Sequence, residues 1–360
     1  MKLSAADYAL AVIGHRMAPL LRQFGDLETS LAARRLGPVA IERPLFISGL
    51  ARSGTTILVD RLARAEGVAT HRYRDFPFLW APLTWNWFQD RLVVEQPAVE
   101  RPHRDRITIT RDSPEAFEEP IWQDFFPWVH DPRRLHILDA ATQNPAFESF
   151  FHDHIRKILL LRGGSRYLSK GNYNVARLAY LARLFPDARF IVPVRAPLAH
   201  VHSLVKQHRL FTGYAHGDKR IGAYLRAAGH YEFGPQRQPI NVSSDGAKRI
   251  LAAWQDGDDY LGYAAQWREI YDHVDSLMGP DSELADRIVV LRYEDFCADP
   301  RTTLAEILDF AGLAAAGAHL LDDLGAISAP PDETADLPAA VRETVGRETE
   351  TVAARFGYDS

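Results

Sequence analysis

The sequence predicts a three-layer α/β fold, in which helices cover both faces of a central parallel sheet. Three observations indicate this fold. A short apolar run at 45–47 leads into a glycine loop and then into apolar residues at helical spacing. An alternation of strands and helices begins near residue 167, and another strand followed by a helix begins near residue 287. Strands that are separated by helices favour parallel pairing, and such sheets bind ligands at the carboxyl ends of their strands.

The loop after the first strand is the strongest local signal, and residues 44–58 have the sequence PLFISGLARSGTTIL. Gly49 and Gly54 permit a tight turn, and the next helix points its positive end at the same spot, so the loop is suited to bind an anion. Its spacing nearly matches the phosphate loop of nucleotide triphosphatases, G-x-x-x-x-G-K-[ST]. Thr55 replaces the lysine of that pattern, and the positive charge lies at Arg52 instead. A nucleotide triphosphatase needs that lysine to bind the β- and γ-phosphates. Its absence therefore indicates that the loop binds a group-transfer donor other than a nucleoside triphosphate.

Residues 1–40 precede this strand and have a helical pattern. Their large apolar residues form one stripe, which consists of Leu10, Ile13, Met17, Leu20, Leu21 and Phe24. We expect this stripe to pack against the first core strand, and Gly25 to end the helix.

The remaining core elements follow from alternating apolar segments. Strands are expected at 167–169, 189–195 and 287–293, and helices at 175–184, 198–208, 261–278 and 302–310. Pro197 precedes the second of these helices, at a position where proline is favoured.

Two segments look irregular. Residues 68–150 are rich in proline, tryptophan and phenylalanine, which suits either the wall of a pocket or a bulky core. Residues 209–256 contain several glycines among charged residues, and we interpret them as an insertion or lid.

A single domain in five segments is therefore expected. These are a helical extension over 1–43, the first part of a nucleotide-binding core over 44–208, a lid or acceptor insertion over 209–256, the rest of the core over 257–313 and a helical tail over 314–360.

Composition narrows the class of protein. The chain has 360 residues, a net charge of −5 and one cysteine. The charge indicates neither nucleic acid nor an anionic membrane as a partner, so an anion site has to be a local cluster of basic residues. Cys297 alone cannot form an internal disulfide or a zinc site. With no secretory signal and no apolar run of about 20 residues, we expect a cytoplasmic protein without a transmembrane segment. The oligomeric state is left open.

Two further motifs lie at the ends of predicted strands. Arg195 leaves the end of one strand, and Ser203 follows about two helical turns later. These two side chains can share one phosphate, because a guanidinium and a hydroxyl recognise both its charge and its geometry. The third motif is Tyr293-Glu294-Asp295, which follows the last strand.

Taken together, the three motifs resemble those of the sulfotransferases that use 3′-phosphoadenosine 5′-phosphosulfate (PAPS). In that family an R/K-S-G-T-T loop holds the 5′-phosphosulfate, an R-x-P…S element holds the 3′-phosphate, and the tyrosine of a Y-E-D segment lies near the nucleotide. The resemblance assigns these donor-binding roles to Arg52, Ser53, Gly54, Thr55, Thr56, Arg195, Ser203 and Tyr293. Arginine before the serine is similar to the tyrosylprotein, Golgi-carbohydrate and bacterial branches.

The resemblance implies transfer of a sulfuryl group to a hydroxyl acceptor, by in-line displacement and without a required metal. A sulfuryl group carries less charge than a γ-phosphoryl group, so loop amides, threonine hydroxyls and Arg52 can hold it. Arg52 is also expected to stabilise the charge that grows on the bridging oxygen in the transition state. The sequence does not specify whether the acceptor is a carbohydrate, a lipid or a small molecule.

An acceptor hydroxyl also needs a general base. Asp75 lies beyond the first helix, about where related branches carry a catalytic glutamate, although it can equally pair with a neighbouring arginine. His71 is the nearby alternative, and Glu119 is the third candidate, although it also suits a capped helix entrance. The family often has a lysine at the position of Lys170, which is expected either to neutralise donor or acceptor charge or to be a solvated turn residue.

Two other functions are compatible with the sequence. A phosphate-loop kinase or triphosphatase variant would use ATP and magnesium, with Asp295 as the nearest candidate metal carboxylate. The second possible function is that of a nucleotide-binding homologue that has lost its general base and is catalytically inactive. His152 and His154 do not suggest a metal site, because side chains at i and i+2 face apart on a helix, and we expect both at the surface.

Overall fold

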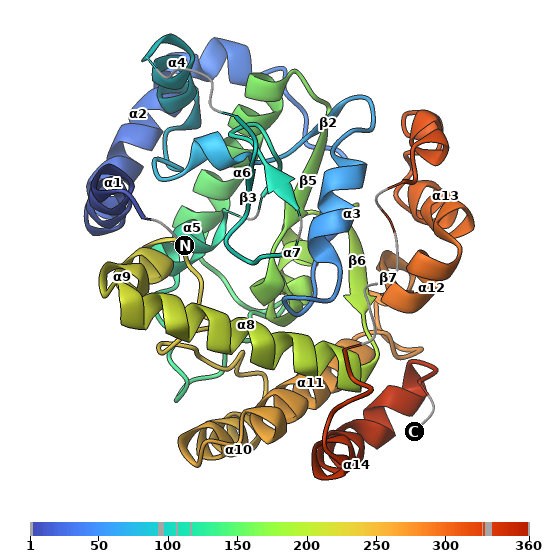
Figure 1. The fold of residues 1–360 in the computed structure, drawn as a ribbon. Helices are drawn as coiled ribbons and strands as arrows, with labels where there is room; N and C mark the ends of the chain where they lie inside the picture. The colour runs from blue at the N-terminus through green and yellow to red at the C-terminus, as the bar shows by residue number, and fades with distance from the viewer. Residues whose placement is uncertain are drawn as a thin grey trace.

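Figure 1 shows the computed structural model, which describes residues 3–92, 97–105, 107–115, 117–325, 327 and 333–358. Its centre is a five-stranded parallel sheet with the strand order β2–β5–β1–β6–β7. The strands are β1 (Leu45–Ile47), β2 (Val68–Ala69), β5 (Arg166–Lys170), β6 (Arg189–Val194) and β7 (Ile288–Arg292). The predicted α/β fold with a parallel sheet is therefore confirmed. The short edge strand β2 and the separate hairpin of β3 (Val99–Glu100) and β4 (Thr108–Ile109) were not expected.

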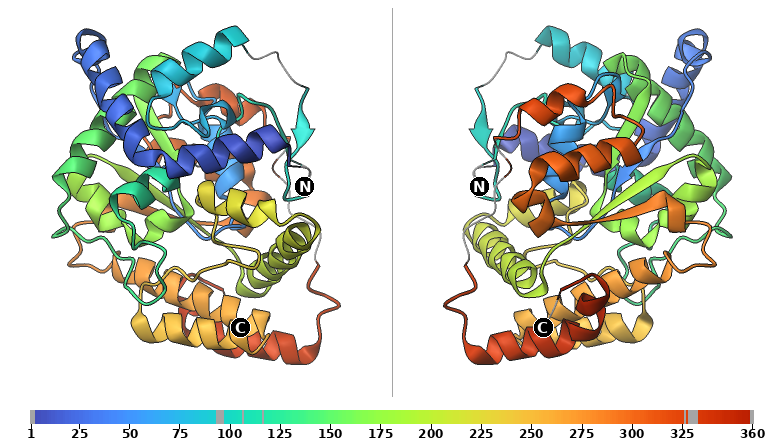
Figure 2. Two further views of the ribbon diagram at one scale, coloured as in Figure 1. Left: turned by 90° about the vertical axis from the view of Figure 1, so that its left-hand side faces the viewer. Right: turned by 90° about the vertical axis from the view of Figure 1, so that its right-hand side faces the viewer.

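Side chains alternate between the two faces of the sheet, and each face has its own apolar cluster. Phe46 and Phe190 belong to one cluster, whereas Ile47, Leu168 and Ile191 belong to the other. The first cluster includes residues of α6 (Pro145–Arg162), α7 (Leu178–Leu184), α8 (Pro197–Gly217), α11 (Asp259–Ser276) and α14 (Ala339–Arg355). The second includes residues of α3 (Thr55–Leu62), α12 (Tyr293–Ala298) and α13 (Pro300–Phe310). The sheet is thus covered on both faces, as Figures 1 and 2 show.

The register of the sheet positions the site. Ile47 in the central strand pairs with Lys170 of β5 on one side and with Ile191 of β6 on the other. Val194, the last residue of β6, pairs with Arg292 of β7. Four strands therefore end near one another at the same edge of the sheet, where the loop after β1 also lies.

Several helices differ from the sequence prediction. The long helix α6 lies in and beyond the segment that was expected to be irregular. Helix α8 continues to Gly217 and so crosses the expected boundary at residue 208. Buried Phe211 continues its apolar face, and Gly213 lies inside the helix without ending it. The remaining helices are α1 (Ala5–Arg16), α2 (Ala18–Leu36), α4 (Pro82–Leu92), α5 (Glu119–Phe125), α9 (Arg220–Ala227) and α10 (Ser244–Gln255). Short 3₁₀ helices lie at Tyr73–Asp75, Asn172–Ala176, Ala285–Arg287 and Ala318–Asp322. None of the helices in the described ranges is long and apolar enough to cross a membrane.

The N-terminal helices do not pack as the sequence predicts. Figure 2 shows α1 and α2 on the outer surface of the molecule, and the stripe that was expected to face the core is mostly exposed. Its exposed members are Leu10, Ile13, Met17, Leu20 and Phe24, while Leu21 is half-buried. The two helices instead bury small residues, namely Ala11, Gly14, Ala18, Gly25 and Ala32. Small side chains allow the helix backbone to pack closely against its neighbours. This close packing, and not the stripe of large apolar residues, determines which face of the two helices is buried.

Gly25 does not end a helix, contrary to expectation, but lies in the middle of α2. A Cβ atom at this position would lie 2.4 Å from the backbone oxygen of Trp80. The carbonyl oxygen of Gly25 also accepts a hydrogen bond of 2.7 Å from Lys157 Nζ on α6. Glycine is thus required by close packing and not by the conformation of a helix end.

We expect Gly25→Ala to lower the free energy of unfolding by about 1–3 kcal/mol, because the added methyl group overpacks the contact with Trp80. This loss should appear although alanine favours helix over glycine by about 1 kcal/mol. Gly346→Ala in α14 is the matched control, since that glycine is exposed and has no atom within 4 Å of a built Cβ. The control should stabilise the protein in urea unfolding followed by circular dichroism. A Gly25→Ala variant as stable as the wild type would contradict the close packing of α2.

Candidate active site

A cavity of about 1550 Å³ opens at the carboxyl end of the sheet. Residues from four strand ends line it. Arg52 lies in the loop after β1, Lys170 ends β5, Arg195 follows β6 and Tyr293 follows β7. The structure therefore brings the three sequence motifs to one cavity, as parallel strands with a common edge require.

The loop after β1 presents its backbone to this cavity. Gly54 is the N-cap of α3 and adopts φ 101°, a left-handed conformation that favours glycine. It supplies no side-chain cap, so the first N–H groups of α3 are left for a ligand. A Cβ atom at position 54 would lie 2.6 Å from Tyr293 Cδ2, so the Tyr293 ring packs directly on the loop. Arg52 also has a positive φ, 73°, which is uncommon for a residue with a side chain and is typical of functional sites.

Polar contacts join Arg52 to the second motif. Its Nε donates to Ser203 Oγ at 3.2 Å, and Arg195 Nη1 donates to the Arg52 carbonyl oxygen at 3.4 Å. The Arg195 guanidinium also lies 5.3 Å from the centre of the Tyr293 ring. Arg52, assigned to the phosphosulfate, and Arg195 and Ser203, assigned to the 3′-phosphate, are thus neighbours, and Tyr293 lies beside Arg195.

Two residues that sequence reasoning missed complete the loop. Asp105 accepts from Arg52 Nη1 at 2.7 Å, and it also pairs with Arg101, whose Nε lies 2.9 Å from Asp105 Oδ1. Arg101 Nη1 in turn donates to Thr56 Oγ1 at 3.2 Å. Burial alone would raise the pKa of Asp105, but the two arginines outweigh it and hold that pKa well below its usual range. No sequence motif marks these residues, because they lie in an irregular segment far along the chain from the loop.

Arg195 is held in place through its neighbours. Glu294, next to Tyr293, accepts from the backbone N–H of Ala196 at 3.0 Å and from the Tyr358 hydroxyl at 2.6 Å. The Trp267 indole donates to the Arg195 carbonyl oxygen at 3.2 Å. The Tyr-Glu pair of the third motif therefore contacts both the loop and the start of α8.

Lys170 lines the cavity and is buried, so it is not a solvated turn residue. Its Nζ donates to Glu115 Oε1 at 2.7 Å, and the Tyr73 hydroxyl donates to Glu115 Oε2 at 2.6 Å. Burial would raise the pKa of Glu115, but Lys170 and Arg101 outweigh it and lower that pKa. The pair is a buried ion pair in the wall of the cavity.

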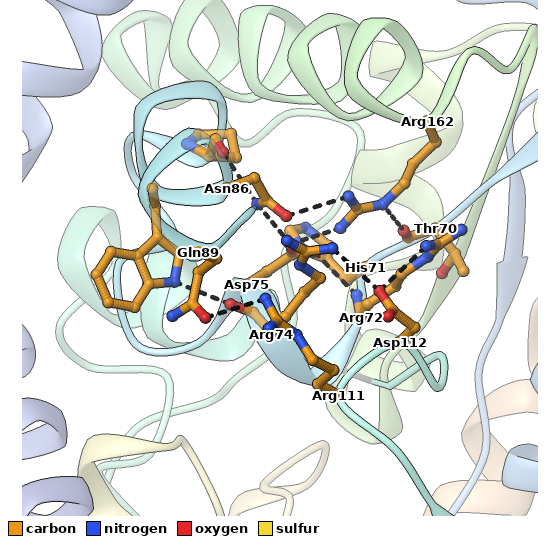
Figure 3. Close-up of polar contacts among 12 residues, drawn as sticks. Thr70, His71, Arg72, Arg74, Asp75, Asn86, Gln89, Arg111, Asp112 and Arg162 are labelled. Carbon is orange, nitrogen blue, oxygen red and sulfur yellow. Dashed lines mark hydrogen bonds and ion pairs between the residues drawn. The ribbon is translucent and has the colours of Figure 1, made fainter. Parts of the chain in front are cut away.

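Asp75 is not positioned to act as a general base, contrary to the leading expectation. It is fully buried and is not among the residues that line the cavity. Figure 3 shows it enclosed by Arg162, Asn86 and His71. Arg162 Nη2 lies 2.5 Å and Asn86 Nδ2 2.8 Å from Asp75 Oδ1. Burial would raise the pKa of Asp75, but hydrogen bonding and charge from these neighbours hold it well below its usual range. The expected structural alternative, a salt bridge, is present, although its partner is Arg162 on α6.

The other two base candidates are not among the residues that line the cavity, although Glu119 lines a small neighbouring pocket together with Lys170 and His230. His71 is buried, with Nδ1 3.3 Å from Asp75 Oδ2 and Nε2 2.9 Å from His154 Nε2. His154 is therefore buried in α6, and its expected place at the surface was wrong. Glu119 forms a two-bond ion pair with Arg177 at 2.7 and 2.8 Å and also contacts His130. These groups stabilise the fold around the site.

Asp295 does not reach the cavity either. It is largely exposed and lies 3.7 Å from Arg292. No group of three or more potential metal-ligating side chains gathers in the part of the chain that the structure describes. The cavity is instead lined near the loop by cations, including Arg52, Arg101 and Arg195, and this arrangement favours a ligand with several anionic groups.

Comparisons with known proteins agree with this geometry. The model of the sulfotransferase family matches residues 44–238. A search of curated proteins finds no match. Among solved structures, sulfotransferase STF9 from Mycobacterium avium is similar with a TM-score of 0.50 and 17% identity, over 91% of this chain and 80% of that one.

Two further solved structures are similar over most of the chain. Sulfotransferase STF1 from Mycobacterium tuberculosis H37Rv has a TM-score of 0.45 and 15% identity, over 96% of this chain and 83% of that one. A sulfotransferase from Alicyclobacillus acidocaldarius has a TM-score of 0.42 and 13% identity, over 89% and 98%.

The place of Asp75 leads to a clear expectation for Asp75→Asn. The change leaves Arg162 buried without its ionic partner, so it should lower the free energy of unfolding by about 3–5 kcal/mol. Because the pKa of Asp75 is depressed in the fold, its contribution is present at neutral pH and lost on acidification, so the variant should lose part of the acid dependence of stability. Urea unfolding between pH 3 and 7 measures both effects.

Asp112→Asn is the control, since Asp112 lies at the half-exposed edge of the same cluster and its loss should change stability by no more than about 0.5 kcal/mol. A catalytic role for Asp75 would give a different result. The variant would then keep its stability and lose roughly 10²–10⁴-fold in kcat.

Proposed function

This chain belongs to the sulfotransferase family and transfers a sulfuryl group, and from this premise we propose that its donor is PAPS and that its acceptor carries a hydroxyl. The observation that carries the proposal is the convergence of Arg52, Arg195, Ser203 and Tyr293 on one cavity. PAPS has two separate anionic ends, a 5′-phosphosulfate and a 3′-phosphate. The cavity has cationic groups from two separate strand ends.

The two ends of the donor are assigned to different parts of the site. The loop 52–56 and the first turn of α3 would hold the phosphosulfate with backbone N–H groups and with the Thr55 and Thr56 hydroxyls. Arg195 and Ser203 would hold the 3′-phosphate, and the Tyr293 ring would lie beside the nucleotide. Support comes from the unfilled cap of α3 and from the cavity lining, which includes Gly54, Thr55 and Thr56. Ser53 is buried, and its hydroxyl donates to the Leu50 carbonyl oxygen at 2.8 Å, so only its backbone is available to the donor.

The positive charge that the loop lacks at position 55 comes from two arginines. Arg52 lies in the loop, and Arg101 reaches Thr56 from another segment. In the transition state, charge grows on the oxygen between the sulfuryl group and the 5′-phosphate. Fixed cations beside that oxygen stabilise the charge without reorganisation, which is the largest contribution to catalysis in many group transfers. We propose this role for Arg52, with Arg101 as a second contributor.

The acceptor would enter from the opposite side of the cavity. The cavity lining also contains aromatic side chains, including Phe76, Phe117, Tyr224 and Phe233, which we propose contact the acceptor. Tyr224 and Phe233 come from the segment 209–256, which supports its proposed place in the acceptor wall. Lys170 lies in the same cavity and would balance the charge of the departing or arriving group. The single cysteine leads us to infer a reducing, cytoplasmic location.

Adenosine 3′,5′-bisphosphate, the product nucleotide, should raise the melting temperature of the protein. At a concentration one hundred times its Kd, a ligand stabilises the native state by about 2.7 kcal/mol, which corresponds to a rise of several degrees. Arg195→Ala should weaken nucleotide binding roughly ten- to hundredfold, because it removes a charge-assisted contact to phosphate. Differential scanning fluorimetry and calorimetric titration measure the two effects.

Arg347→Ala serves as the control for Arg195→Ala, since Arg347 is exposed on α14 and pairs there with Glu343. ATP with magnesium should protect the protein less than the bisphosphate nucleotide. Equal or better protection by ATP with magnesium would favour a kinase or triphosphatase. No melting shift with the bisphosphate and the intact protein would contradict PAPS as the donor.

A further inference from the structure

A histidine–carboxylate pair lies in the cavity wall, in the loop between α9 and α10. His230 Nδ1 is 3.4 Å from Glu232 Oε2, and both residues line the cavity. The side chain of Glu232 is only 8% exposed, whereas that of His230 is 37% exposed. The carboxylate is therefore buried behind the imidazole, and the imidazole has access to the space inside the cavity.

Neighbouring contacts fix the orientation of the pair. Asn172 Nδ2 donates to Glu232 Oε1 at 2.8 Å, and the Tyr263 hydroxyl donates to the Glu232 carbonyl oxygen at 2.9 Å. Glu232 Oε2 has no hydrogen-bond partner among the described residues, and His230 Nδ1 lies at ion-pair distance from it. Within the described part of the chain, Nε2 of His230 has no protein hydrogen bond. Because Nδ1 is turned toward the carboxylate, Nε2 is the ring nitrogen that is left to accept a proton.

The pair lines the same cavity as the phosphate loop and is connected to a neighbouring strand. Asn172, which holds Glu232, follows two residues after Lys170 at the end of β5. Lys170 pairs in the sheet with Ile47, the last residue of the strand that leads into the loop. Glu232 is thus linked through Asn172 to the end of the strand next to the loop, and His230 lines the same cavity as the loop.

We propose that His230 is the general base that accepts the proton of the acceptor hydroxyl, and that Glu232 is the positioning residue that orients it. This inference rests on the proposed sulfuryl transfer. As the acceptor oxygen forms its bond to sulfur, its proton passes to Nε2 of His230. The bond between sulfur and the 5′-phosphate oxygen breaks, and its electron pair leaves with the adenosine bisphosphate. The proton remains on the imidazolium, whose charge Glu232 balances.

Other titratable groups of the cavity are less suited to this step. Glu115 is bonded to Lys170 and Tyr73. His103 is bonded through Nδ1 to Gln207, and burial together with Arg101 lowers its pKa to about 3. His230 alone combines a buried orienting carboxylate with an open ring nitrogen among the described cavity histidines.

The charges around His230 determine its titration. Glu232 lies on its own segment, Glu115 and Lys170 face it from other elements, and His103 is also close enough to interact. Burial would lower the pKa of His230, but Glu232 outweighs it and raises that pKa above its ordinary value. Burial would raise the pKa of Glu232, but His230 and Asn172 lower it to about 2. The ionised form of the pair therefore persists to higher pH than that of a free histidine, and the base form of His230 appears as the pH rises further.

We expect His230→Gln to lower kcat/KM by roughly 10²–10⁴-fold with benzyl alcohol as the probe acceptor and radiolabelled PAPS as the donor. The loss should be much smaller with p-nitrophenol, which is far more acidic than benzyl alcohol and is partly ionised near neutral pH, so that it depends less on a base. The melting shift with adenosine 3′,5′-bisphosphate should stay unchanged. His216→Gln, at an exposed position near the end of α8, is the matched control.

Glu232→Gln separates positioning from packing. It should lower kcat/KM tenfold or more and move the acid limb of the pH profile to lower pH, because the carboxylate no longer raises the pKa of His230. Titration of the His230 ring by NMR, assigned through His230→Gln, gives a readout that needs no turnover. The wild-type pKa should lie above about 6.5 and should fall in Glu232→Gln.

Two results would overturn the inference. One is turnover within about threefold of wild type in His230→Gln with benzyl alcohol, and the other is a His230 titration that Glu232→Gln does not move. If the wild type turns over neither probe acceptor, the NMR titration decides. Failure of the proposed function looks different, because the wild type would then show no melting shift with the bisphosphate nucleotide.

Discussion

The contact of the Tyr293 ring with Gly54 is the constraint on which the geometry of the site depends. The ring lies where a Cβ atom at position 54 would be, and it also lies over the Arg195 guanidinium. One aromatic side chain at the end of β7 therefore contacts both the loop after β1 and the residue after β6. Glu294 adds a second contact between the same elements, since its carboxylate accepts a hydrogen bond from the backbone at the start of α8. The phosphate loop is held by neighbours from other strands, and its own sequence accounts for only part of its shape.

The sequence was sufficient where structure depends on short-range patterns. The strand before the loop, the left-handed Gly54 and the sites of Arg195 and Tyr293 all follow from a few adjacent residues and from the rule that parallel strands share a binding edge. It was insufficient where tertiary packing determines which face of an element is buried. The exposed stripe of α1 and α2 and the buried Gly25 depend on which helix face meets Trp80, and helical periodicity does not contain that information.

The same distinction explains which site residues were missed. Asp105 meets Arg52 across 53 positions of the chain, and Asn172 meets Glu232 across 60. Asp75 and Glu232 are both buried carboxylates beside a histidine, so residue type does not separate them. What differs is the second ring nitrogen, because that of His71 is bonded to His154 while His230 opens on the cavity. Only the folded chain distinguishes a structural pair from one that can exchange a proton with a ligand.

The pairing of Arg52 with Asp105 makes the binding of an anion an exchange reaction. In the described structure the Asp105 carboxylate already forms ion pairs with two of the cations around the loop, Arg52 and Arg101. A phosphate or sulfuryl group that binds Arg52 has to approach or displace this internal anion, whose negative charge opposes its own. The same carboxylate can pair with Arg52 again when the anion leaves. An internal competitor of this kind lowers the residence time of the product, and it keeps a cluster of buried cations electrostatically balanced between turnovers.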